Sequence, residues 1–276
     1  MKAQNLTISV PYKGCDKDCP YCISKMTGYI ESDEDQFRAN MFKARTVAKA
    51  AQVSSILITG KGEPFLNIEA CNLIGENFVE FPIEIQTNGI KLMQQWDENK
   101  TILGSKYLDV IAFSIDDIDQ WKYYAPMMKD IWENYGIVVR VTLNMTDKID
   151  CSRYPFWMHA VEFAGDTNVS QLSFRNVIAP ETRVSTDESG NAARWIEEHG
   201  CADAYDSIVK DFKECTFDVI RKLSFGATVY DVNGVAVTMF DECVQHTNNN
   251  EDIRSLIYQE DGHMYTSWDS PASILF

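Results

Sequence analysis

Up to residue 222, apolar and polar positions alternate in a way that predicts repeated strand–helix units. Short runs rich in β-branched residues predict strands, and segments with apolar residues every three or four positions predict helices. In 33–51, for example, Phe37, Met41 and Ala44 share one side, and acidic residues fill the first turn. The predicted strands are 6–10, 56–59, 83–86, 109–115, 137–143 and 171–176. The predicted helices are 33–51, 68–78, 118–134, 153–164 and 191–221.

The pattern changes after residue 222. Segments 224–230 and 235–240 alternate in polarity and flank Asn233-Gly234, a strong signal for a β-hairpin. Two further strands are predicted at 253–258 and 264–268. We therefore expect an α/β core with a mainly parallel sheet at 1–222, because six successive strand–helix units favour right-handed crossovers. Residues 223–276 are expected to form a small antiparallel β extension that covers the mouth or the open side of that core.

Three cysteines follow the first predicted strand closely. Cys15, Cys19 and Cys22 form a C-x3-C-x2-C triplet. Three thiolates can hold three irons of a [4Fe–4S] cluster and leave the fourth iron open for chemistry. A zinc site is the alternative, but zinc prefers four Cys or His ligands, commonly in two close pairs, and the next histidine is His159. The triplet therefore favours an iron–sulfur site.

A second motif follows the second predicted strand. The run Gly60-Lys61-Gly62-Glu63-Pro64 places glycines where the backbone can approach a ligand closely, and Pro64 fixes the exit of the turn. Taken alone, this run is equally consistent with a surface turn.

Together these two motifs resemble those of the radical S-adenosylmethionine (radical SAM) superfamily, and Tyr21 before the third cysteine fits that family's aromatic position. The resemblance covers roughly residues 5–222 and implies a partial (β/α)6 TIM-like barrel, open at one side. It implies that Cys15, Cys19 and Cys22 hold a [4Fe–4S] cluster whose open iron binds SAM. One electron from the cluster then cleaves SAM to methionine and a 5′-deoxyadenosyl radical, which abstracts hydrogen from a substrate.

The resemblance also implies roles for individual residues. Gly62 and Glu63 match the positions that bind the amino group of SAM, although Lys61 departs from the commonest form of the motif. Polar groups at the carboxyl ends of barrel strands bind the rest of SAM, which selects the following candidates. They are Thr87, Asn88, Ser114, Asp116 and Asn144. Two plain alternatives stay open: Asp116 caps the next helix, and Arg140 only pairs with a carboxylate.

Substrate-contacting residues are harder to find in the sequence. Arg175, at the end of the sixth predicted strand, and Arg254 and His263, in the tail, are the candidates. The tail is interpreted either as a lid over the substrate or as a hairpin that fills the core. The remaining cysteines lack the close spacing of a second cluster and are interpreted as free thiols. They are Cys71, Cys151, Cys201, Cys215 and Cys243.

The net charge of the chain limits the kinds of molecule that we expect it to bind. The chain carries 25 basic and 41 acidic residues, a formal net charge of −16. A strongly acidic chain argues against binding bulk nucleic acid, which basic surfaces meet. A flavodoxin- or ferredoxin-type reductant is expected to dock at Lys13, Lys17 and Lys25 near the cluster loop. No apolar signal region or membrane-spanning run is found, and iron-ligating cysteines need a reducing compartment, so we expect a cytoplasmic protein.

The sequence therefore predicts a radical SAM enzyme that acts on a small-molecule or nucleotide-like substrate. Three alternatives stay open: activation of a glycyl-radical enzyme, modification of a peptide, and modification of a nucleic-acid base. A further alternative is a different class of protein, a non-catalytic iron–sulfur module for electron transfer. This alternative predicts a fourth cysteine near the triplet. Metal analysis of anaerobically prepared protein separates all of these from a zinc-stabilised binding protein.

Overall fold

One large sheet organises the chain. The computed structural model describes residues 2–96, 107–149, 155–223, 227–240, 252–268 and 270–276. Its eleven strands lie in the order β11-β10-β1-β2-β3-β4-β5-β6-β9-β8-β7, and the neighbouring strands from β10 to β9 all run parallel. The parallel strands are β10 (Asp252–Tyr258), β1 (Lys2–Ser9), β2 (Ser55–Thr59), β3 (Ile83–Thr87), β4 (Val110–Ile115), β5 (Val138–Met145), β6 (Gln171–Asn176) and β9 (Val235–Phe240). The predicted α/β class with a mostly parallel sheet is confirmed.

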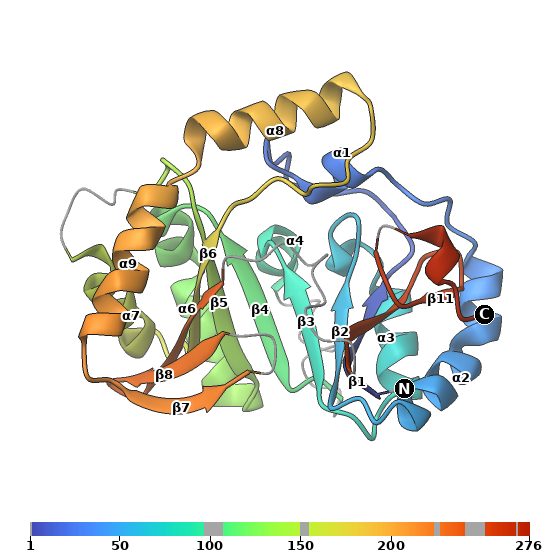
Figure 1. Ribbon diagram of the computed structural model, residues 1–276. Helices are drawn as coiled ribbons and strands as arrows, with labels where there is room; N and C mark the ends of the chain where they lie inside the picture. Colours follow the sequence, from blue (N-terminus) through green and yellow to red (C-terminus); the bar gives the residue numbers. More distant parts are fainter. Residues whose placement is uncertain (1, 97–106, 150–154, 224–226, 241–251, 269) are drawn as a thin grey trace.

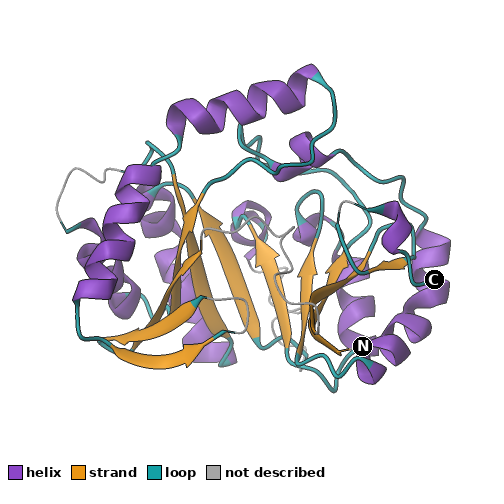
Figure 2. Ribbon diagram, in the orientation of Figure 1, coloured by secondary structure: helices purple, strands orange, loops and turns teal. Residues whose placement is uncertain are grey.

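Most helices follow the strands and cover one face of the curved sheet, whereas α8 and the short α1 lie across the strand ends (Figures 1 and 2). The helices are α1 (Ile23–Thr27), α2 (Glu34–Ala50), α3 (Ile68–Asn77), α4 (Ile90–Gln94), α6 (Ile118–Tyr135), α7 (Phe156–Asp166), α8 (Asp187–His199) and α9 (Ala202–Glu214). The predicted apolar stripe of α2 is buried, and Asp33 caps the helix by accepting from the Gln36 amide at 2.9 Å.

The two faces of the sheet differ in chemistry. Along β5, for instance, Val139 and Val141 are completely buried against the helices, whereas Arg140 and Thr142, which alternate with them, are only half-buried. The same alternation occurs in β2 and β6. The helix-covered face therefore holds the core, and the opposite face, called the inner face below, is polar and partly accessible.

The prediction for the tail was wrong in its strand directions. The hairpin of β8 (Thr228–Val232) and β9 forms as expected, with Asn233 and Gly234 at φ of 54° and 83°. However, β9 runs parallel to β6, and β10 runs parallel to β1 at the opposite end of the parallel strands. The antiparallel pairs are β7 (Asp218–Lys222) with β8, β8 with β9, and β10 with β11 (Met264–Tyr265). Local pattern cannot tell which sheet edge a tail strand will join, because that depends on the edges left open by the core.

The predicted helix 191–221 was also wrong in its extent. It is two helices, α8 and α9, separated by extended backbone at Gly200 and followed by strand β7. Apolar spacing continues through the break, so the pattern concealed it. Within the described ranges, no helix is both long and apolar enough to cross a membrane.

Candidate active site at the carboxyl ends of the parallel strands

The cysteine loop crosses the end of the sheet at which the parallel strands terminate (Figure 1). It leaves β1 after Ser9 and enters α1 at Ile23. Cys15 is exposed and Cys19 and Cys22 are half-buried, all three as free thiols. The Cys22 amide donates to the Cys19 carbonyl at 3.2 Å, which forms a tight turn between the last two cysteines.

Burial favours the protonated form of two of these thiols, Cys15 and Cys19. Burial is the main cause that raises the pKa of Cys15, and it raises that of Cys19 to about 11. Within the described part of the chain, no three Cys, His, Asp or Glu side chains converge closely enough to hold a metal ion. The donor set nevertheless suits iron–sulfur chemistry, because three free thiols share one loop and influence one another electrostatically. Binding a cluster would require this loop to draw its thiols together.

The glycine-rich turn after β2 touches the cysteine loop directly. The Glu63 amide donates to the Gly14 carbonyl at 3.0 Å. A Cβ atom on Gly62 would lie 2.0 Å from that same carbonyl oxygen, so only glycine fits there. Lys61, the departure from the commonest motif, donates to the Thr27 hydroxyl in α1 at 2.7 Å. The turn is thus a support for the cysteine loop as well as a candidate SAM contact.

Glu63 is a buried carboxylate with three donors from its own chain. It accepts from the Thr87 hydroxyl at 2.7 Å, from the Asn88 amide at 2.9 Å and from the Phe65 amide at 3.1 Å. Asn88 connects Glu63 to the cysteine loop. Its side-chain amide donates to the Asp16 carboxylate at 2.8 Å and lies 3.8 Å from the Cys15 sulfur. The structure therefore brings Glu63, Thr87 and Asn88, three of the residues predicted to contact SAM, together beneath the cysteine loop.

Burial of Glu63 predicts a pH-dependent stability. Burial outweighs the three hydrogen bonds and raises the pKa of Glu63 from 4.5 to about 7. A carboxyl whose pKa is higher in the folded state stabilises the fold below the unfolded pKa, and that stability is lost as pH rises through about 7. In urea unfolding of cluster-free protein, we expect the wild type to lose on the order of 3 kcal/mol more between pH 4.5 and 8 than Glu63→Gln does. Parallel pH curves for the two proteins would contradict this.

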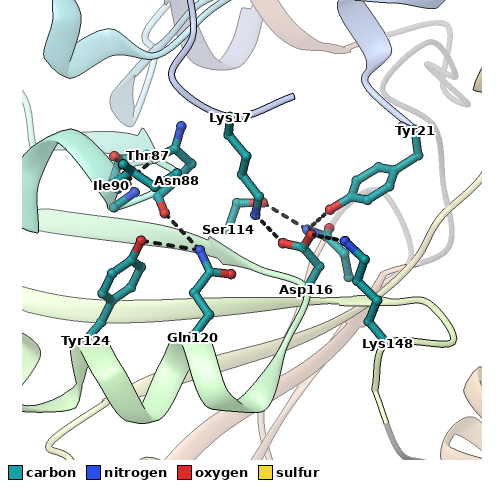
Figure 3. A network of polar contacts seen from close by, with 12 residues as sticks. Lys17, Tyr21, Thr87, Asn88, Ile90, Ser114, Asp116, Gln120, Tyr124 and Lys148 are labelled. Atoms are coloured by element: carbon teal, nitrogen blue, oxygen red, sulfur yellow. Dashed lines mark hydrogen bonds and ion pairs between the residues drawn. The ribbon is translucent and has the colours of Figure 1, made fainter. Parts of the chain in front are cut away.

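A second polar group surrounds Asp116, just past β4 (Figure 3). Asp116 is 3% exposed and forms an ion pair with Lys17 of the cysteine loop. It also accepts from the Tyr21 hydroxyl, and the Lys148 ammonium lies 4.0 Å from its other oxygen. The cap of α6 is Asp117, which accepts from the Asp119 amide, so the alternative that Asp116 caps this helix was wrong.

Ser114 and Asn144 join the same group from β4 and β5. The side-chain amide of Asn144 donates to the Ser114 hydroxyl at 2.9 Å and to the Tyr21 hydroxyl at 3.3 Å. Tyr21 therefore connects the cysteine loop to two strand ends, and burial raises its pKa far above the ordinary value, so it remains a neutral donor. Arg140, lower on the inner face, pairs with Glu84 and donates to Gln171 at 2.7 Å, as its plain alternative predicted.

Helix α8 covers this group, a placement that the predicted helix 191–221 did not indicate. Trp195 lies with its ring centroid 5.4 Å from that of Tyr21, and it stacks on His199 at 4.7 Å. Residues of α8 and α1 form a small apolar cluster separate from the main core, built on Met26, Ala192, Ala193 and Ile196. In Figure 1, α8 and α1 lie across the strand ends. No local motif marks Trp195, because its partner Tyr21 is far away along the chain.

Two of the three candidate substrate residues approach the same aromatic ring, and the third lies elsewhere. Arg175 lies beside Asn144 in the register of β5 and β6, and its guanidinium is 5.7 Å from the Phe240 ring centroid. Arg254 of β10 approaches the same ring at 5.0 Å. His263 is engaged elsewhere, between Gln36 of α2 at 2.7 Å and the Phe276 carbonyl at 2.8 Å. Arg175 therefore lies next to the candidate site, whereas His263 contacts α2 and the carbonyl of Phe276.

Of the other cysteines that the structure describes, Cys71 adjoins the glycine-rich turn, where its thiol donates to the Pro64 carbonyl at 3.4 Å. Cys71 is buried, Cys201 is half-buried and Cys215 is exposed, all as free thiols. Cys151 and Cys243 lie outside the described residues.

A tail residue that the sequence analysis missed, Glu260, holds the start of the cysteine loop. It is fully buried, and its carboxylate accepts from the Ser9 hydroxyl at 3.0 Å, the Ser32 hydroxyl at 2.9 Å and the Tyr12 amide at 3.1 Å. Strand β10 places it there by pairing with β1. In the sequence, Glu260 is one of two adjacent acids after an apolar strand, and this pattern carries no indication of these partners.

We expect Glu260→Ala to loosen the cysteine loop. Loss of this acceptor removes the hydrogen bond of the fully buried Ser9 hydroxyl, which costs about 1–3 kcal/mol, and leaves the Tyr12 amide with only its longer bond to the Ser32 hydroxyl at 3.3 Å. Cluster-free Glu260→Ala should therefore show a lower free energy of unfolding, and its cysteines should react faster with a thiol reagent under native conditions. The exposed neighbour Glu31→Ala is the control and should match the wild type. Equal reactivity in all three proteins would contradict the role.

Comparison with known proteins supports the superfamily. The chain is 38% identical over 93 residues to the GTP 3′,8-cyclase of Clostridium acetobutylicum. The match covers 32% of this chain and 28% of that protein, so the chain aligns with less than a third of its relative's length. No family model matches the chain. The similarity supports the resemblance to radical SAM enzymes in general and does not distinguish between substrates.

Proposed function

We propose that this protein is a radical SAM enzyme acting on a small-molecule or nucleotide-like substrate. The observation that carries the proposal is the contact between the C-x3-C-x2-C loop and the Gly62–Glu63 turn, two motifs that lie about forty residues apart in the sequence and share a hydrogen bond at Gly14. The partial match to GTP 3′,8-cyclase supports it independently. Within this proposal, strands β1 to β6 correspond to the open, partial (β/α)6 barrel that the resemblance implies, and β10 and β9 of the tail extend it at its two edges.

In this proposal Cys15, Cys19 and Cys22 hold a [4Fe–4S] cluster, and SAM binds beside it. When bound, the cluster supplies the electron for reductive cleavage of SAM, which in turn supplies a 5′-deoxyadenosyl radical for hydrogen abstraction. Glu63 accepts a hydrogen bond from the SAM ammonium, for which its second oxygen, with one donor from the chain, has capacity. Ser114 and Asn144 offer polar groups to the rest of SAM, and α8 excludes water from the site.

The chain's own ion pairs alter the proposed docking of a reductant. Lys17 reaches inward to Asp116 and is only 17% exposed. Lys25 pairs with Asp18 and is 19% exposed, whereas Lys13 pairs with Glu34 and is 48% exposed. A flavodoxin- or ferredoxin-type donor is therefore proposed to approach the side of the loop that carries Lys13, in a reducing, cytoplasmic compartment.

One experiment tests the reaction class and the substrate together. Anaerobically reconstituted protein is mixed with dithionite, SAM and pools of deuterated candidate substrates, including nucleotides. We expect 5′-deoxyadenosine to form and to carry deuterium when the substrate is present. Failure of fully loaded protein to cleave SAM at all would overturn the proposal, and the electron-transfer module would then be the better explanation. Transfer that requires a protein partner would instead favour a glycyl-radical activase.

A further inference from the structure

The turn after β2 holds Lys61 beside the cysteine loop from both sides. Before Lys61, the Val10 amide donates to the Thr59 carbonyl at 2.8 Å. After it, the Glu63 amide donates to the Gly14 carbonyl at 3.0 Å. Val10 and Gly14 both belong to the segment that leads from β1 into the cysteines. The backbone at Lys61 is therefore tied to that loop.

The side chain of Lys61 reaches the other end of the same loop. Its ammonium donates at 2.7 Å to the hydroxyl of Thr27, the last residue of α1. The Thr27 hydroxyl in turn donates to the Ile23 carbonyl at 2.9 Å, and Ile23 directly follows Cys22. Lys61 therefore connects the glycine-rich turn to the helix that begins at the third cysteine.

Lys61 differs from the other lysines near the cysteines in having no ion pair. Each lysine on the cysteine loop itself has a carboxylate partner. The pairs are Lys13–Glu34, Lys17–Asp116 and Lys25–Asp18. Among the residues that the structure describes, no carboxylate lies within ion-pair distance of the Lys61 ammonium, which bonds to an uncharged hydroxyl instead.

The carboxylates around the loop are bonded to uncharged donors. Glu260, the acid that acts most strongly on Lys61, accepts from two serine hydroxyls and from the Tyr12 amide. Glu63 and Asp16 accept from hydroxyl and amide groups, among them those of Asn88. These acids keep their negative charge close to the cysteines. The charge of Lys61 offsets them at a distance, so its loss would leave the loop in more strongly acidic surroundings.

Burial makes the charge of Lys61 costly and also makes it effective. Burial lowers the pKa of Lys61, and interactions with Glu260 and then with Cys22 act in the opposite direction. The ammonium therefore lies within electrostatic range of the third cysteine. Cysteine binds iron as the thiolate, and a [4Fe–4S] cluster takes up one further negative charge when it is reduced. Lys61 is thus a fixed positive charge at a place where the proposed function adds negative charge.

We propose that Lys61 raises the reduction potential of the cluster, because its fixed ammonium beside Cys22 stabilises the reduced, more negative form. This rests on the proposed function and adds to it a residue that the resemblance leaves without a role. One electron passes from the reductant to the cluster, no bond in the protein forms or breaks, and the lysine acts through its charge alone. The potential of a cluster depends on the charge around it, so Lys61 is a positioning residue for the electron rather than a contact of SAM.

The test compares midpoint potentials in redox titrations of reconstituted protein, followed by electron paramagnetic resonance. Lys61→Met keeps the apolar stem and removes the charge. We expect the equilibrium constant for reduction of its cluster to fall by roughly tenfold, which lowers the midpoint potential by about 59 mV for one electron. Lys61→Arg keeps the charge and should retain most of the wild-type potential. Thr27→Val keeps the ammonium without the hydroxyl that holds it, so its potential should fall by a smaller amount.

A matched control separates Lys61 from general charge. Lys129→Met removes the same group from α6, on the helix-covered side of the sheet, where Lys129 is about half exposed and pairs with Glu133. Its potential should equal that of the wild type, because solvent and salt screen an exposed charge. If Lys61→Met takes up no cluster, Thr27→Val decides: a lower potential supports the inference, and an unchanged one overturns it.

Two results would overturn the inference. One is an equal midpoint potential in the wild type and in fully loaded Lys61→Met, and the other is an equal shift in Lys129→Met. Lower stability of Lys61→Met in urea, with no change in potential, would reduce its bond to Thr27 to a structural contact. A potential that depends on Lys61 in a protein that does not cleave SAM would keep the inference and remove the proposed function. SAM cleavage with a potential independent of Lys61 would do the reverse, so the two failures are distinguishable.

Discussion

Alanine at any one of Cys15, Cys19 and Cys22 is expected to abolish SAM cleavage. The three thiols are the only cysteines on the loop that crosses the strand ends, and a three-ligand cluster has no spare ligand to replace a lost one. Anaerobically reconstituted wild type should contain about four irons and four sulfides per chain, as a [4Fe–4S] cluster requires. Each single variant should retain little iron and produce no 5′-deoxyadenosine.

Cys215→Ala is the matched control for this experiment, because Cys215 is an exposed free thiol at the end of α9, away from the loop. It should keep the full cluster and full activity. Full iron content in the triple variant of Cys15, Cys19 and Cys22 would refute the assignment.

Glu63→Gln is expected to lower SAM affinity by roughly 10- to 150-fold while the cluster stays intact. The variant removes a charge-assisted hydrogen bond to the SAM ammonium, worth about 1.5–3 kcal/mol. Glutamine keeps the shape of the side chain, which matters because alanine would leave three donors without their acceptor. Equilibrium dialysis of SAM against reconstituted protein measures the change.

The surface acid Glu80→Gln serves as the control for Glu63. Glu80 pairs with Arg45 and Lys49 on the outside of the molecule, so its loss should not change SAM affinity. Iron content and a thermal melt show whether Glu63→Gln still folds and loads. Unchanged SAM affinity in a folded, loaded Glu63→Gln protein would mean that Gly62 and Glu63 only support the cysteine loop.

The sequence located the two candidate motifs because each of them is local. The cysteine triplet and the Gly60–Pro64 turn each lie within one short segment, and each follows a strand whose β-branched pattern is plain. The carboxyl ends of parallel strands meet at one edge, so Thr87, Asn88, Ser114, Asp116 and Asn144 could be expected near one another without a structure. Their roles toward SAM stay predictions.

Local pattern failed where a residue's partners are far along the chain. Apolar spacing ran through the break at Gly200 and merged α8 with α9. The alternation in the tail gave the strands but not their partners, and β9 and β10 joined opposite ends of the parallel sheet. Asp116 was also one position from the true helix cap, and only its contact with Lys17 shows which aspartate turns inward.

By itself, then, the sequence determined the strand–helix order, the thiol donor set and the glycine-rich turn, because each depends on residues close together in the chain. Only the tertiary structure decided that Glu260 supports the cysteine loop, that Trp195 covers Tyr21, and that Arg175 adjoins Asn144. These contacts join segments separated by 30 to more than 240 positions. They exist because sheet register and burial, rather than local propensity, set which side chains meet.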